Sequence, residues 1–239
     1  MKPIAVFQHT EVGAPGTITA ILEALGHQVN LIRIVDGDPV PENAAQFSGL
    51  VFMGGYMSVH DDLPWIPLEL ALIRDADARG LPMVGHCLGS QLLALALGGS
   101  VGRHVAPEIG WLPIQTGNDA LAQEWWGEFA GGEVQTFQWH GDTFQPPLGA
   151  RQIARSAHCE NQAFVMSDRH LLLQSHLEMT PRLVELSFER NGEQLTRQFA
   201  VGNPAVSDPA DLLNSLDART SAMQAVLERL YARWVRRCV

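Results

Sequence analysis

The sequence predicts an α/β protein with three layers: a mostly parallel central sheet between two layers of helices, with an added antiparallel portion. The first half of the chain alternates short apolar runs, typical of buried strands, with longer runs typical of helices. The second half has five strand-like runs close together, which favours hairpins. A chain of 239 residues with 46% hydrophobic residues can bury one sizeable core.

The first half supplies the parallel part of the predicted sheet. Strand patterns cover residues 4–7, 29–34, 49–53 and 81–84, and helix patterns cover residues 18–25, 68–78 and 92–97. Gly26 and Gly80 end the first two helix patterns. Ligands of such sheets gather at the carboxyl ends of the strands. We therefore expect Gly54-Gly55 and Cys87, which follow two of the strands, to be neighbours.

The second half supplies the antiparallel part and the last helices. Its strand patterns cover residues 109–114, 133–139, 152–156, 163–167 and 171–175. A helix is predicted over residues 181–190, because Thr180 can cap it and Pro181 suits its first position. Apolar residues recur at helical spacing within residues 208–237, which predicts one or two helices that pack on the body of the protein.

Charge, cysteine content and hydropathy restrict the class of protein. The net charge of −10 argues against a broad surface for nucleic acid or an anionic membrane. No apolar run is long enough to span a bilayer, and the N-terminal run is too short for a signal peptide. The three cysteines are far apart and lack metal-ligand spacing, so we expect no metal and a cytoplasmic location.

One segment predicts a reactive cysteine. The sequence Gly85-His86-Cys87-Leu88-Gly89-Ser90-Gln91 joins a predicted strand to a predicted helix. A nucleophile on such a turn needs small residues two positions away on each side, because larger side chains would collide there. The start of a helix also favours a thiolate over a thiol. Cys87 is therefore the predicted nucleophile.

A second segment predicts the base that would activate this cysteine. His176 and Glu178 follow the apolar run 171–173. On an extended chain, residues two apart point to the same side, so the Glu178 carboxylate can hold one imidazole nitrogen while the other faces the sulfur. His140 is the alternative base, with Asp142 as the only acid at strand spacing.

Four segments together resemble the class I glutamine amidotransferase domain, and most closely the stand-alone members similar to the amidotransferase half of GMP synthetase. They are the cysteine segment, the glycine loop at 52–59, Gln138-Trp139-His140-Gly141-Asp142, and Gln174-Ser175-His176-Leu177-Glu178. The resemblance covers roughly residues 1–190 and implies a flavodoxin-like fold. Leu177 stands where the family usually has proline, Ser175 where it has an aromatic residue, and Tyr56 where it often has proline.

The resemblance also implies roles for further residues. The backbone N–H groups of Gly55 and Leu88 would bind the oxyanion, and Gln91 would face the polar end of glutamine. His140, Gly141 and Asp142 would bind the α-amino and α-carboxylate groups. We expect a single domain over residues 1–239, with a catalytic body at about 1–190 and a helical extension at about 205–239, and no cofactor.

The predicted reaction is hydrolysis of the γ-glutamyl amide of glutamine, with ammonia passed to a synthase partner. The first alternative is a stand-alone hydrolase of γ-glutamyl peptides or amides. The second is a regulatory binding protein on the same fold, which the intact Cys87, His176 and Glu178 count against. A third alternative is an α/β-hydrolase whose acid would be Asp142 in place of Glu178.

Overall fold

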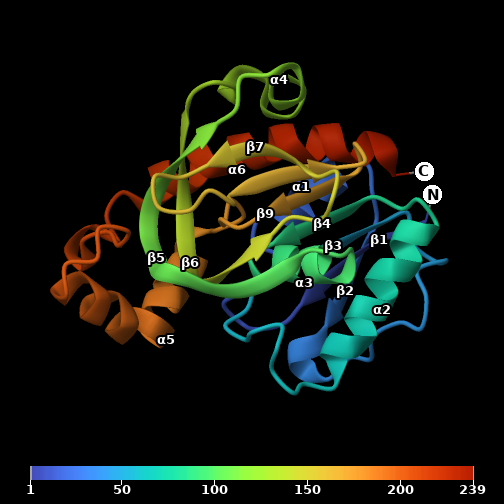
Figure 1. The fold of residues 1–239 in the computed structure, drawn as a ribbon, viewed down its shortest axis with the longest axis horizontal. Helices are drawn as coiled ribbons and strands as arrows, with labels where there is room; N and C mark the ends of the chain where they lie inside the picture. The colour runs from blue at the N-terminus through green and yellow to red at the C-terminus, as the bar shows by residue number, and fades with distance from the viewer. Residues whose placement is uncertain (1, 239) are drawn as a thin grey trace.

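The computed structural model describes residues 2–238, which form one nine-stranded sheet with helices on both faces (Figure 1). The strand order is β2-β1-β3-β4-β9-β8-β7-β5-β6. The strands are β1 (Ile4–Gln8), β2 (Val29–Arg33), β3 (Gly49–Phe52), β4 (Met83–His86), β5 (Ser100–Thr116), β6 (Glu133–Gln145), β7 (Arg151–Arg155), β8 (Ala163–Met166) and β9 (His170–Leu173).

The predicted mixed sheet is confirmed. Strands β2, β1, β3, β4 and β9 pair in parallel, and the remaining pairs, from β9 through β8 and β7 to β5 and β6, are antiparallel. The two parts meet at β9, which pairs in parallel with β4 and antiparallel with β8. The end of β9 is therefore fixed on both sides.

Helices cover both faces of the sheet (Figure 1). They are α1 (Ile18–Ala24), α2 (Trp65–Ala78), α3 (Leu88–Ala96), α4 (Ala120–Trp126), α5 (Pro181–Ala200) and α6 (Leu216–Trp234), with short 3-10 turns at Ile34–Asp36, Gly127–Phe129, Pro209–Asp211 and Val235–Arg237. Side chains alternate along the strands, so Ile4 and Val6 belong to the core that also contains residues of α1, α4, α5 and α6. Ala5 and Phe7 belong to a second core, with residues of α2 and α3.

Several predicted boundaries were wrong. Helix α2 begins at Trp65, not at 68, and β4 covers Met83–His86, not 81–84. Strand β9 ends at Leu173, not at 175. Helix α5 continues past the predicted end at 190 to Ala200, because Leu195 is buried and anchors the continuation. Strand β5 extends at both ends beyond the predicted 109–114, because it pairs with β6 along most of its length.

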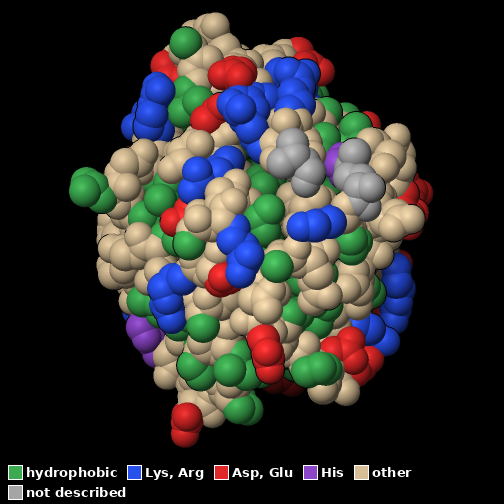
Figure 2. All heavy atoms as spheres, turned by 90° about the vertical axis from the view of Figure 1, so that its right-hand side faces the viewer, with side chains coloured by type: hydrophobic (Ala, Val, Ile, Leu, Met, Phe, Trp, Pro, Cys, Tyr) green, Lys and Arg blue, Asp and Glu red, His purple; other side chains and the backbone are tan. Residues whose placement is uncertain are grey.

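Basic side chains are prominent on one face of the molecule, although the sequence has a net charge of −10. Figure 2 shows basic and acidic side chains interspersed over the face at the right of Figure 1. None of the described helices combines the length and the low polarity that crossing a membrane requires.

Candidate active site

Cys87 stands on a sharp turn between β4 and α3. Its backbone angles are φ 50° and ψ −108°, a region that non-glycine residues rarely adopt. A Cβ at Gly85 would lie 2.4 Å from the Ser90 nitrogen, and a Cβ at Gly89 would lie 2.0 Å from the Phe52 oxygen. The two glycines are therefore required, as the sequence predicted, for the turn to form.

His176 and Glu178 follow β9, the neighbour of β4. The strands pair in register at His86 and Leu173, and the Cys87 N–H donates to the Leu173 carbonyl at 2.7 Å. His176 then bonds in both directions with the backbone of Phe137 on β6. The sheet thus places two segments that are far apart in the sequence at the same edge.

The imidazole of His176 is held by a buried carboxylate. Its Nδ1 lies 2.6 Å from Glu178 Oε1, and the Leu177 N–H donates to Glu178 Oε2 at 2.9 Å. Burial disfavours the charged imidazole, but the Glu178 carboxylate and the Cys87 sulfur outweigh it, so the pKa of His176 lies well above its usual value. Burial also opposes ionisation of Glu178, yet His176 and His86 hold the pKa of this carboxyl far below its usual value.

Gly54 packs against the side chains of both Cys87 and His176. A Cβ at this position would lie 2.7 Å from His176 Cε1 and 3.5 Å from Cys87 Cβ. The neighbouring Gly55 lines the pocket, and a Cβ there would lie 3.0 Å from Leu88 Cδ2. Leu88 is the first residue of α3, so its N–H has no partner inside the helix. The glycine loop and the start of α3 are therefore in contact beside Cys87.

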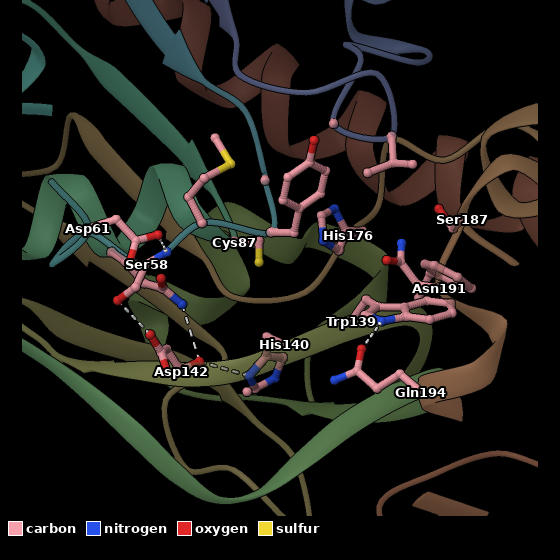
Figure 3. A pocket seen from close by; sticks show the side chains of 18 of the residues that line it. Ser58, Asp61, Cys87, Trp139, His140, Asp142, His176, Ser187, Asn191 and Gln194 are labelled. Atoms are coloured by element: carbon pink, nitrogen blue, oxygen red, sulfur yellow. Dashed lines mark hydrogen bonds between the residues drawn. The ribbon is translucent and has the colours of Figure 1, made fainter. Parts of the chain in front are cut away.

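The predicted substrate-binding residues lie at one end of the same pocket (Figure 3). Gln91 Nε2 donates to the Asp142 carbonyl at 3.2 Å, and the Ser58 hydroxyl donates to Asp142 Oδ2 at 2.9 Å. Gly141 lines the wall, and the exposed Arg103 places its Nε 3.4 Å from Asp142 Oδ1. The structure thus brings Gln91, Gly141 and Asp142 together.

His140 lines the pocket but differs from the prediction in its partner. Its Nδ1 lies 3.0 Å from the Asp142 carbonyl, and its Nε2 lies 2.9 Å from the buried carboxylate of Glu108. Asp142 is the only acid at strand spacing from His140, but the acid that contacts the imidazole is Glu108 of the neighbouring strand. Pairing of β5 with β6 puts Glu108 opposite His140, and a spacing along one strand cannot reveal a cross-strand neighbour.

Three buried groups near Cys87 and Glu178 were not predicted. Gln174 Nε2 lies 3.7 Å from Cys87 Sγ. His86 Nδ1 lies 3.1 Å from Glu178 Oε2, and its Nε2 lies 2.9 Å from the hydroxyl of Tyr231 on α6. His86 and Gln174 occur inside the two segments already singled out, whereas Tyr231 carried no signal in the sequence.

The pocket has a volume of about 270 Å³ and opens on both sides of Cys87. Opposite the Asp142 end, it is lined by Trp139 on β6 and by Ser187, Asn191 and Gln194 on α5. Within residues 2–238, no three histidine, cysteine or acidic side chains are grouped as metal ligands.

Proteins similar to this chain in sequence or structure include glutamine amidotransferases and γ-glutamyl peptidases. A glutamine amidotransferase from Methylobacillus flagellatus is 38% identical in sequence, with a TM-score of 0.94 over 100% of this chain and 96% of that one. γ-Glutamyl peptidase 4 of Arabidopsis thaliana is 28% identical over 70% of this chain and 68% of its own length. One subunit of the glutamine-hydrolysing GMP synthase of Saccharolobus solfataricus is 28% identical over 65% of this chain and 81% of its own length.

A known family model matches the part of the chain that contains most of the site residues. The model of the family described as glutamine amidotransferase class I matches residues 14–193, a range that contains the glycine loop, Cys87, His176 and Glu178. The match spans well over half of the chain, and this protein therefore belongs to the class I glutamine amidotransferases.

Proposed function

We propose that this protein hydrolyses γ-glutamyl amides through Cys87, His176 and Glu178. The observation that supports it most strongly is the placement of Cys87 and His176 on adjacent strand ends, with Glu178 Oε1 2.6 Å from the imidazole. Membership of the family is consistent with this chemistry. The two glycines around Cys87 allow the turn to form, and Cys87 lines the pocket although its side chain is largely buried.

The geometry suggests the following reaction. The Cys87 thiolate attacks the side-chain carbonyl carbon, and the N–H groups of Gly55 and Leu88 stabilise the oxyanion; such donors contribute roughly 3 kcal/mol each. His176 gives its proton to the leaving nitrogen as the C–N bond breaks. Water then attacks the γ-glutamyl thioester, returns a proton to His176 and releases glutamate and the free sulfur. Glu178 fixes the imidazole tautomer throughout.

Two fates of the leaving amine are consistent with the family. Similarity to the GMP synthase protein supports glutamine as substrate, with a synthase partner that uses the ammonia. Similarity to γ-glutamyl peptidase 4, whose own length is largely matched, supports a stand-alone hydrolase of γ-glutamyl compounds. In both cases His140, Gly141 and Asp142 would surround the charged end of the glutamyl group. The Asp142 carboxylate would bind the α-ammonium of that group.

Glutamate release tests the proposal. The purified protein should release glutamate from glutamine or from γ-glutamyl dipeptides, and Cys87→Ala should lower the rate of release by at least about a thousandfold. Mass spectrometry of a quenched reaction should find the γ-glutamyl adduct on Cys87. Full activity of Cys87→Ala would contradict the proposal, and Cys159→Ala serves as the control, since Cys159 is buried outside the pocket.

A further inference from the structure

The pocket continues beyond the proposed reacting groups toward helix α5. Figure 3 shows His176 between Cys87 and a group formed by Trp139, Asn191 and Gln194. The opposite end holds Ser58, Asp61 and Asp142. If the charged end of the glutamyl group lies at Asp142, the leaving nitrogen points toward His176 and its substituent toward α5. This inference rests on the proposed function.

The side chains at the α5 end are arranged to bind a ligand larger than ammonia. The Trp139 N–H donates to Gln194 Oε1 at 2.9 Å, and its ring packs on Phe137 with centroids 5.9 Å apart. The indole is therefore fixed in orientation, and it lines the pocket. Within the part of the chain that the structure describes, the Gln194 amide NH₂ and the Asn191 carboxamide have no hydrogen-bond partner. Ammonia would use none of these groups.

The chemistry of these groups fits an amino acid. A flat indole face suits an apolar or aromatic side chain, and neutral amide N–H groups can donate to a carboxylate without an ion pair. We propose that Trp139, Asn191 and Gln194 form a subsite for the leaving amino acid, so that the preferred substrates are γ-glutamyl dipeptides with an apolar or aromatic second residue. The amide C–N bond breaks, and the amino acid leaves with the proton from His176.

Ratios of kcat/KM between substrates test this subsite. The ratio for γ-glutamyl-phenylalanine over γ-glutamyl-glycine should exceed about tenfold in the wild type and fall by about tenfold in Trp139→Ala, because one aromatic contact is lost. Asn191→Asp places a negative charge beside the carboxylate and should lower turnover of γ-glutamyl-phenylalanine relative to γ-glutamyl-phenethylamine, which lacks that group. Glu193→Gln, outside the pocket on the same helix, is the matched control.

The outcomes separate this inference from the proposed function. Hydrolysis with unchanged ratios in both variants would overturn the subsite and leave the proposed function intact, as would a wild type that prefers glutamine. No glutamate from any of these compounds would overturn both. Trp139→Phe keeps an aromatic face and should retain most of the ratio, which guards against a folding defect in the alanine variant.

A second, independent feature links the C-terminal helix to the proposed triad. Tyr231 lies on α6, outside the residues that the family model matches. Its hydroxyl lies 2.9 Å from His86 Nε2, and His86 Nδ1 lies 3.1 Å from Glu178 Oε2, an ion-pair distance without the geometry of a hydrogen bond. All three side chains are fully or almost fully buried.

This arrangement connects α6 to Glu178 through Tyr231 and His86. The hydroxyl of Tyr231 can donate to Nε2 of His86, which leaves the other ring nitrogen as the N–H that faces the carboxylate. We infer that Tyr231 and His86 are positioning residues, which hold the Glu178 carboxylate in the orientation in which it contacts His176. The titratable groups that face this carboxylate and imidazole are His86, Cys87 and Tyr231, with Cys238 beside Tyr231.

The pH profile of kcat/KM distinguishes positioning from a purely structural role. Removing the hydroxyl in Tyr231→Phe should weaken the hold of Glu178 on the His176 proton, so the alkaline limb of the profile should move by about half a unit toward lower pH, and kcat should fall about three- to tenfold. His86→Gln should move the limb further. Trp234→Phe, which changes an α6 side chain packed on Tyr231 with centroids 5.5 Å apart, is the control. An unmoved profile in Tyr231→Phe and His86→Gln would overturn the inference.

Discussion

At the scale of single residues, Gly54 lies against His176 and Cys87 with no room for a side chain of its own. An added Cβ would lie 2.7 Å from His176 Cε1, closer than real contacts allow. We predict that Gly54→Ala displaces the imidazole and lowers kcat/KM by at least about a hundredfold, because a shift of about 1 Å at a reacting group has an effect of this size. Circular dichroism should show that the variant is folded.

A matched glycine makes this prediction specific. Gly132 has only Phe129 O near an added Cβ, at 3.7 Å, and does not line the pocket. Gly132→Ala should keep full activity. Activity of Gly54→Ala close to that of the wild type would show that His176 does not need its present position.

Residues near one another in sequence could be predicted, and partners from distant elements could not. The sequence pointed to Cys87, His176 and Glu178 because each lies in a short segment with a recognisable local geometry. These are a strand-to-helix turn for Cys87 and an extended chain for His176 and Glu178. Glu108 and Tyr231 were missed because β5–β6 pairing and the docking of α6 bring them to His140 and His86 from positions far away in the chain. The catalytic roles themselves stay predictions.

At the scale of elements, a buried histidine joins the start of β9 to the end of α2. His170 Nε2 lies 3.0 Å from Asp77 Oδ1, and Arg169 donates to the same oxygen at 2.6 Å. Burial lowers the pKa of His170 to about 4, although the Asp77 carboxylate opposes the shift. The element junction is thus built around a neutral imidazole.

This junction predicts a pH-dependent stability. Below its usual pKa of about 6.5, His170 binds a proton in the unfolded chain but not in the folded chain, so its contribution to stability falls as the pH is lowered. Urea unfolding should show the wild type losing about 2 kcal/mol more than His170→Gln between about pH 7 and pH 5. The pKa of His176 is raised, so its contribution to stability changes with pH in the opposite direction. That contribution is the same in the wild type and in His170→Gln, so it cancels when the two proteins are compared. Equal losses would contradict the prediction.

Element types could be predicted better than element lengths. The strand and helix patterns of the first half were confirmed, because alternation of apolar residues reports burial directly. The predicted helix stopped at residue 190, yet α5 continues to Ala200 because Leu195 packs on the core. The strand predicted over 109–114 is likewise longer, because β5 pairs with β6 along most of its length.

At the scale of the whole molecule, Arg233 ties α6 to two distant elements. Its guanidinium is buried and lies 2.6 Å from both Glu124 on α4 and Asp168 at the β8–β9 turn, over the Trp125 ring at 5.1 Å. Arg233→Met should lower the free energy of unfolding by about 1–2 kcal/mol, since both carboxylates remain partly hydrated once the charge is gone.

Urea denaturation measures this change, and a neighbouring arginine is the control. Arg236 is exposed and, among residues 2–238, forms no ion pair, so Arg236→Met should stay within about 0.5 kcal/mol of the wild type. Equal effects in the two variants would rule out a special role for Arg233. The division of the chain into a catalytic body and a helical extension stays a prediction.

The spacing of Cys87 and His176 and the shape of the pocket walls depend on different parts of the chain, because β4 and β9 are adjacent in the sheet. One ladder of backbone hydrogen bonds fixes the spacing of Cys87 and His176, while the long antiparallel excursion between them supplies Trp139 and Asp142. Mutations in that excursion can reshape the pocket walls without touching the ladder. Substitutions in the excursion can therefore change which molecules fit the pocket while the strand pairing that spaces Cys87 and His176 stays the same.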